Sequence, residues 1–198
     1  SMMSLPRIFG LTAETIPPPA RLVIPEDSAE RARRMLAPFE RRLKIGVLWS
    51  GSVTYRANHK RSFPQERFYP LAAIPGVQLF SLYKGPLLEA FRGSGLASVI
   101  IDAGGSDRDF ADTAALIRRL DLVVSMDSAI VHIAGSFGLP VWNLLHYSAY
   151  WLYAPHPDHT TWYPSMRLIR QPKLDDWDSV FATVERDVAA LAAHRGGG

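Results

Sequence analysis

The stretch that most constrains the fold is residues 120–145, which read LDLVVSMDSAIVHIAGSFGLPVWNLL. Its apolar run at 122–124 is short and rich in β-branched residues, which is typical of a buried strand. The Ser-Met-Asp-Ser sequence that follows predicts a helix start with Asp127 or Ser128 as the N-cap, and Gly138 is expected to end the helix. Residues 141–145 then form a second predicted strand. The stretch therefore predicts a compact βαβ unit.

The polar residues of this unit stand where the first strand ends and the helix begins. In parallel sheets, ligands bind at that edge. His132 lies one turn after Ser128, so both side chains are expected on one face of the helix near its N-terminus. Such a terminus offers free N–H groups and about half a positive charge, which suits phosphate. Asp127, Ser128 and His132 are thus candidate anion ligands, although two helix caps and a core histidine would also explain them.

Alternating strand and helix patterns continue through the rest of the chain. They predict an α/β fold with a Rossmann-like, doubly wound parallel sheet. The further strands are expected at residues 44–49, 77–82, 98–101 and 167–169. The further helices are expected at residues 65–73, 87–92, 110–119 and from about 176 onward. The third has an apolar stripe that includes Phe110, and the last has apolar residues at helical spacing, namely Val180, Val184, Val188 and Leu191. A basic helix over 31–44, capped by Asp27 or Ser28, is interpreted as a solvated amphipathic face rather than a polyanion site.

Two other predicted strand ends also carry candidate ligands. Ser50 and Gly51 follow the strand at 44–49, and small residues there let a ligand approach the backbone closely. Lys84 follows the strand at 77–82 and is suited to neutralising a diphosphate. Arg61 lies in a predicted polar loop at 55–62, where it either attracts phosphate or is a solvated loop charge. Together with the anion ligands above, these residues predict a pyrophosphate-binding crevice.

Composition and motifs exclude several other classes. The 198 residues contain no Cys, which excludes disulfides and zinc–thiolate sites, and the net charge of +3 is dispersed, which disfavours a nucleic-acid partner. No apolar run reaches the roughly 18 residues of a membrane span, and no signal pattern opens the sequence, so a cytoplasmic location is expected. The dinucleotide, P-loop and serine-hydrolase motifs are absent. His156 and His159 are interpreted as surface residues rather than metal ligands.

The run at 120–140 closely resembles a signature of bacterial glycosyltransferases of the ADP-heptose lipopolysaccharide heptosyltransferase type. It is similar also to the glycosyltransferase-like region that follows tetratricopeptide repeats in some bacterial proteins, which are distant relatives of O-GlcNAc transferase. Other matching stretches are IGVLWSG at 45–51, Arg61-Ser62, FSLYKG at 80–85, FADTAA at 110–115 and WYPSMRLIRQ at 162–171.

This resemblance implies one half of a GT-B architecture. The half that binds the nucleotide sugar would be residues 41–195, and residues 1–40 would be a linker and trailing helix of a missing N-terminal domain. Asp127, Ser128 and His132 would face the donor diphosphate and sugar, with Ser50, Gly51 and Lys84 in the same crevice. Residues 102–112 would approach the nucleoside. The acceptor site, and often the catalytic base, would belong to the missing domain or a partner subunit.

Some positions depart from the family pattern. Ser128 replaces a frequent Thr and keeps the hydroxyl, and Tyr83 replaces a frequent Gln. Residues 148–151 (SAYW) replace a D-W-R-W-like stretch and so lose an acid and an Arg. The sequence thus predicts the donor-binding domain of a metal-independent glycosyltransferase, with no cofactor besides the nucleotide-diphosphate sugar and no assigned catalytic residue. The alternative is a degenerate, non-catalytic module that binds a nucleotide or a protein.

Overall fold

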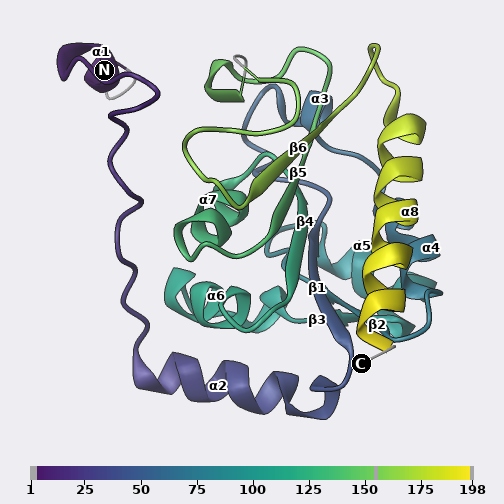
Figure 1. The fold of residues 1–198 in the computed structure, drawn as a ribbon. Helices are drawn as coiled ribbons and strands as arrows, with labels where there is room; N and C mark the ends of the chain where they lie inside the picture. The colour runs from purple at the N-terminus through teal and green to yellow at the C-terminus, as the bar shows by residue number, and fades with distance from the viewer. Residues whose placement is uncertain (1–3, 154–155, 197–198) are drawn as a thin grey trace.

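A computed structural model describes residues 4–153 and 156–196 of the chain (Figure 1). Its centre is a six-stranded sheet in the order β3-β2-β1-β4-β5-β6, in which every neighbouring pair is parallel. The strands are β1 (Leu43–Leu48), β2 (Val77–Ser81), β3 (Ile100–Asp102), β4 (Leu122–Met126), β5 (Val141–Leu145) and β6 (Met166–Arg170). The predicted Rossmann-like, doubly wound sheet is confirmed.

Helices cover both faces of this sheet. In Figure 1, α6 and α7 lie on one face with α2 below them, whereas α4, α5 and α8 lie on the other. The α-helices are α1 (Leu5–Ile8), α2 (Glu26–Leu36), α3 (Asn58–Arg61), α4 (Tyr69–Ala72), α5 (Leu88–Arg92), α6 (Phe110–Ile117), α7 (Ala129–Ser136) and α8 (Trp177–Gly196). Short 3-10 turns lie at Ala37–Phe39, Gln65–Phe68, Gly95–Ser98, Gly104–Ser106 and Trp151–Tyr153.

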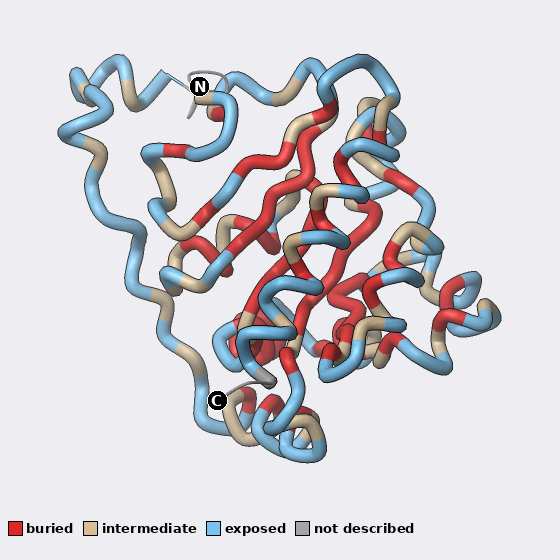
Figure 2. Tube along the Cα trace, turned by 45° about the vertical axis from the view of Figure 1, so that its right-hand side comes forward, coloured by how far each residue is buried: buried red, intermediate tan, exposed pale blue. Residues whose placement is uncertain are grey.

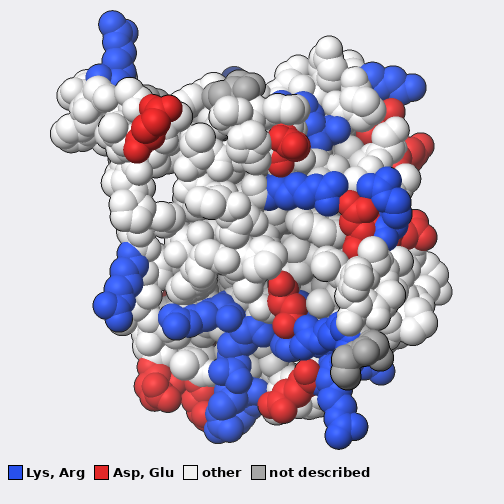
Figure 3. All heavy atoms as spheres, in the orientation of Figure 1, with Lys and Arg blue, Asp and Glu red and all other residues white. Residues whose placement is uncertain are grey.

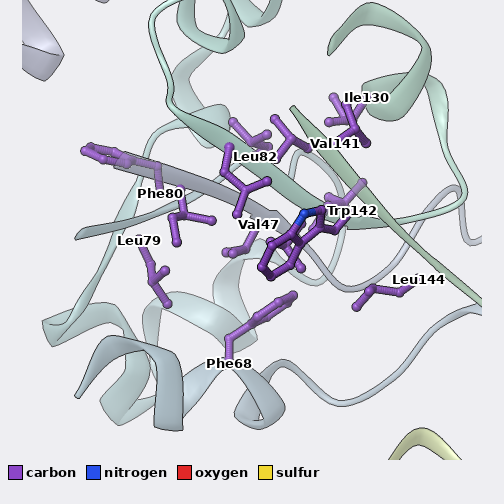
Figure 4. Close-up of a cluster of buried hydrophobic side chains, with 14 of the residues drawn as sticks. Val47, Phe68, Leu79, Phe80, Leu82, Ile130, Val141, Trp142 and Leu144 are labelled. Carbon is purple, nitrogen blue, oxygen red and sulfur yellow. The ribbon is translucent and has the colours of Figure 1, made fainter. Parts of the chain in front are cut away.

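The core follows from this layering. The central strands β1 and β4 are apolar along almost their whole length because helices cover them from both sides. Val47 and Val124, which are paired in the register of these two strands, are fully buried. Figure 4 shows Val47 among the buried side chains of β2 and β5 and near Phe68 of the adjoining 3-10 turn. Figure 2 shows the buried strands through the middle of the molecule, with exposed chain around them.

Aromatic side chains fasten α8 to its face of the sheet. Phe63 lies edge-on to Trp177 and Phe181, with ring centroids 4.8 and 4.9 Å away. Edge-to-face pairs of this kind each add about 0.5–1.5 kcal/mol beyond the apolar area that they bury. Val180, Val184 and Val188 continue the buried face of the helix, as predicted from their spacing, whereas Leu191 is exposed.

Four local predictions were wrong. The loop expected at 55–62 contains α3. The strand expected at 98–101 begins only at Ile100, as β3, because Gly95–Ser98 forms a 3-10 turn. Phe110, predicted to belong to the buried stripe of α6, is exposed. The basic helix expected at 31–44 is α2, and its N-cap is Pro25 rather than Asp27 or Ser28. Asp27 pairs instead with Arg108, which precedes α6, and Ser28 donates to Asp112 of α6.

The segment before α2 runs away from the body of the molecule. It is extended and largely exposed, and it leads to α1 at a distance from the sheet (Figures 1 and 2). None of the helices in the described part of the chain combines the length and apolar character that a membrane crossing requires. The division of the chain into a linker with a trailing helix at 1–40 and a domain at 41–195 stays a prediction.

A buried carboxylate connects α2 to α6. Asp112 accepts hydrogen bonds from Ser28 of α2 at 2.8 Å and from Arg108 through Nε at 2.8 Å and Nη2 at 2.7 Å. Arg108 also pairs with Asp27 at 2.8 Å, and Arg31 lies 3.8 Å from Asp112. The Asp112 side chain is only 1% exposed, whereas that of Arg108 is 55% exposed, so the network joins a buried carboxylate to a cation at the surface.

This network predicts a pH-dependent contribution to stability. Arg108, by donating to Asp112, holds the pKa of that carboxyl well below its usual range. The contribution is therefore complete above the unfolded pKa of about 3.9 and is lost as the pH falls through the lower folded pKa. Asp112→Asn should lower the free energy of unfolding by about 2 kcal/mol at pH 7, because hydrogen bonds to charged groups contribute roughly 1.5–3 kcal/mol. Urea denaturation at a series of pH values measures it.

Asp178→Asn is the matched control for this substitution. Asp178 pairs with Arg67 at 2.6 Å, but its side chain is 88% exposed, and such pairs contribute about 0–1 kcal/mol. The difference in the free energy of unfolding between the unmodified chain and Asp112→Asn should narrow as the pH falls below about 4. An equal loss in the free energy of unfolding at pH 7 for Asp112→Asn and Asp178→Asn would contradict the stabilising role assigned to Asp112.

Candidate functional site

An open cavity of about 1520 Å³ lies at the carboxyl edge of the sheet. Its centre is the boundary between β1 and β4, where the chain connections turn in opposite directions, and ligands of doubly wound sheets bind at such a point. All seven residues that were predicted as ligands line this one cavity, although they come from separate parts of the sequence. They are Ser50, Gly51, Arg61, Lys84, Asp127, Ser128 and His132.

The turn between β4 and α7 forms one wall. Of the two predicted caps, Ser128 is the N-cap of α7, and its Oγ accepts a hydrogen bond from the Ile130 N–H at 3.2 Å. Asp127 accepts a hydrogen bond from the hydroxyl of Tyr153 at 3.2 Å. Tyr153 is buried, and burial together with the Asp127 charge raises the pKa of its phenol, so the hydroxyl stays protonated and can donate to Asp127. This contact holds the Asp127 carboxylate beside the N-terminus of α7.

His132 stands one turn further along α7 and faces Tyr163. Its Nδ1 lies 3.3 Å from the Tyr163 hydroxyl. Burial lowers the pKa of the imidazole, and the Asp127 charge partly opposes that effect. Gly135 makes this arrangement possible, because a Cβ there would lie 2.5 Å from the Tyr163 ring. His132 therefore presents a neutral ring to the cavity near neutral pH.

The end of β1 forms the opposite wall, and α3 organises it. Asn58 donates from Nδ2 to Ser50 Oγ at 3.0 Å, and its Oδ1 accepts the Gly51 N–H at 3.1 Å. A Cβ on Gly51 would lie 3.0 Å from the Arg61 guanidinium, so this glycine lets the cation approach the strand end. The Arg61 guanidinium lies over the Tyr55 ring at 4.5 Å, and its buried Nε has no hydrogen-bond partner.

Lys84 approaches the cavity from the end of β2. Its ammonium donates to the Asp107 carbonyl, which precedes α6. The Asp107 side chain is buried and accepts a 2.6 Å bond from Thr113, and burial raises its pKa. Asp109 caps α6 by accepting from the Ala111 N–H, and Phe110 beside it is 64% exposed and lines the cavity. Of the region predicted to approach a nucleoside, Asp109 and Phe110 therefore border the cavity, whereas Asp102 is paired with Arg92.

Several lining residues were missed from the sequence. His146 follows β5 and Gln171 follows β6, so the rule that selected the other strand ends also points to them. Asn58 and Tyr153, which hold Ser50 and Asp127, carry no such signal, because their contacts span eight and 26 positions of the chain through loops.

The described side chains offer no evident metal centre. Within residues 4–153 and 156–196, no three His, Asp or Glu side chains come together in a way that could hold an ion. His156 and His159 stack on each other at 4.1 Å, and His159 contacts Asp158 at 2.8 Å. Neither histidine lines the cavity.

The chain has a Rossmann-like α/β fold with a cavity at the carboxyl edge of its parallel sheet, and this fold is the one found in one half of solved GT-B glycosyltransferases. Two solved structures share this fold. They are the glycosyl transferase family 9 protein from Veillonella parvula (TM-score 0.66, 18% identity, 97% of this chain and 59% of that one) and ADP-heptose LPS heptosyltransferase II from E. coli (TM-score 0.64, 18% identity, 93% and 58%).

A curated relative is also recognisable from sequence. Protein FlbA of Caulobacter vibrioides is 32% identical over 155 residues, which cover 74% of this chain and 26% of FlbA. This chain thus spans about a quarter of that relative and less than two thirds of either solved structure. No family model matches the sequence. The association with tetratricopeptide repeats stays a prediction.

The electrostatics of His132 can be tested directly. Asp127→Asn should lower the pKa of His132 further, because the Asp127 charge raises that pKa against the effect of burial. A titration of the imidazole by NMR measures the change. Asp178→Asn, on α8 across the sheet, serves as the control and should leave it unaltered. A rise in the pKa of His132 in Asp127→Asn would contradict the arrangement.

Proposed function

We propose that this chain is the donor-binding half of a metal-independent glycosyltransferase, and that the cavity holds a nucleotide-diphosphate sugar. The main support for this proposal is that seven candidate ligands, from four segments of the chain, line one cavity. That cavity lies at the point where doubly wound sheets bind ligands. The shared fold with glycosyltransferases supports the same proposal.

The centre of the cavity suits a diphosphate. The N-terminus of α7 supplies free N–H groups and partial positive charge, with the Ser128 hydroxyl beside it. Lys84 and Arg61 bring full positive charges from two other walls. A diphosphate leaving group gains negative charge as the sugar departs, and donors that are already oriented stabilise that charge without reorganisation. In this proposal the leaving group is stabilised by protein groups and no metal ion.

One side of the cavity suits a nucleoside. Phe110 exposes its ring at the start of α6, and aromatic side chains stack on bases with about 1–3 kcal/mol each. Asp109 lies beside it as a hydrogen-bond acceptor. This side lies at β2 and β3, next to Lys84, so a nucleoside there would direct its diphosphate toward α7.

The acceptor and the catalytic base come from another domain or subunit in this proposal. Asp127 is held by Tyr153 and faces the helix start, which is a position for binding donor rather than for activating an acceptor. The isolated chain should therefore bind donor yet transfer sugar only slowly. Rapid transfer by the isolated chain, measured with released nucleotide, would contradict this division of roles.

Calorimetry with uridine-, guanosine- and adenosine-diphosphate sugars tests donor binding. One of them should bind, and Lys84→Ala combined with Ser128→Ala should weaken it at least about tenfold, because a hydrogen bond to a charged group contributes roughly 1.5–3 kcal/mol. Lys84→Ala alone should have part of this effect. This single variant keeps the Ser128 cap of α7, whose loss costs about 1 kcal/mol of stability, so it separates an effect on binding from an effect on folding.

Arg41→Ala is the control, since Arg41 is an exposed cation outside the cavity. It should leave the affinity unchanged, and circular dichroism should show all variants folded. If no nucleotide binds the folded chain, the alternative of a degenerate module that binds a protein is favoured.

A further inference from the structure

One corner of the cavity carries polar groups that a donor diphosphate at α7 would not use. We call it the β5–β6 corner and define it by Lys60, His146 and Gln171, which follow or border the last two strands of the sheet. Parallel strands lie about 4.8 Å apart, so the corner begins one to two strands, or about 5–10 Å, beyond the turn after β4. Gln171 and His146 are close to each other, because Gln171 bonds to the residue that follows His146, and the charge of Lys60 from α3 acts on His146.

Gln171 lines the corner and carries a buried, unpaired donor. Its side chain is buried, with only 1% of the residue exposed. Its Oε1 accepts the Tyr147 N–H at 3.0 Å, whereas its Nε2 has no hydrogen-bond partner. A buried amide donor without a partner is destabilising, so a ligand that accepts a hydrogen bond from it relieves that cost. The fixed Oε1 leaves the carboxamide able only to donate.

The charge of the corner points to an acidic ligand. Burial lowers the pKa of His146, and the positive charges of Lys60, Arg170 and Arg61 lower it further, while Asp127 alone among the contributing groups opposes them. In the described part of the chain, Lys60 makes no ion pair. Cations and an N–H donor therefore gather here. Two carboxylates line the cavity on this side, namely Asp127, which is bonded to Tyr153, and Asp175, which follows β6.

We propose that the β5–β6 corner is an oxyanion subsite, and that it takes a carboxylate or phosphate group carried by the sugar of the donor. This inference rests on the proposed function for the order of the ligand along the cavity. With the nucleoside at β2 and β3 and the diphosphate at α7, the sugar extends toward β5 and β6. The substrate class is accordingly an acidic nucleotide sugar.

The subsite itself is tested with inorganic phosphate and NMR, in the Ser128→Ala, Lys84→Ala background that lacks the diphosphate site. Phosphate should shift the Gln171 side-chain amide in a saturable way and raise the pKa of His146, because an anion stabilises the imidazolium. Lys60→Gln should weaken this binding about tenfold, whereas Lys173→Gln, at an exposed lysine outside the cavity, should not. If phosphate changes neither the Gln171 amide signal nor the pKa of His146 in the double variant, the proposal of a separate subsite is overturned.

The acidic sugar is tested with matched donors on the unmodified chain. Uridine-diphosphate glucuronate carries a carboxylate where uridine-diphosphate glucose carries a hydroxymethyl group, and the two donors are otherwise identical. The same comparison is made with the guanosine- and adenosine-diphosphate sugars. The acidic donor should bind at least about fivefold more tightly, and Lys60→Gln and Gln171→Glu should abolish this preference. Gln171→Glu keeps the acceptor for Tyr147 and replaces the donor with a repelling charge.

Free glucuronate and glucose 6-phosphate, competed against phosphate, show whether the corner prefers a carboxylate or a phosphate. Equal binding of acidic and neutral donors overturns the inference while the proposed function stands. If neither donor binds but phosphate still reaches the corner, the proposed function fails and the oxyanion subsite remains.

Discussion

The structure depends on the register between β1 and β4, the two strands at the centre of the sheet. Their paired residues, such as Val47 and Val124, are fully buried, because helices pack on both faces. The chain winds outward from β1 to β2 and β3 on one side, and from β4 to β5 and β6 on the other. The connections on either side therefore leave the carboxyl ends of these two strands uncovered, and the cavity lies there.

Tertiary contacts fasten each wall of this cavity from behind. Asn58 holds the turn after β1, Tyr153 holds Asp127, and the Asp107 carbonyl receives Lys84. Cations enter the cavity from several walls, whereas the outer surface is mixed. On the face shown in Figure 3, basic side chains gather over the region of α2 and α6 with acidic ones among them.

Prediction from the sequence succeeded where one local rule was enough. The βαβ unit, the capping role of Ser128 and the strand β5 were predicted directly, because hydrophobic period and helix capping act over a few residues. It failed where a distant partner changed the outcome. Asp27 and Ser28 have the residue types of helix caps, but their side chains bond to Arg108 and Asp112, and Pro25 is the N-cap instead. Phe110 fits an apolar stripe but faces the cavity.

The sequence by itself determined the fold class, the strand ends and the residue types at the cavity, because these follow from local pattern and from the geometry of parallel sheets. Only the tertiary structure decided the strand order, the burial that keeps His132 neutral and the contacts that hold Asp127 and Ser50. It also showed that Gln171 and His146 share a corner with Lys60. Those relations join segments far apart in the chain, and the free energy that holds them arises from packing, which no local pattern contains.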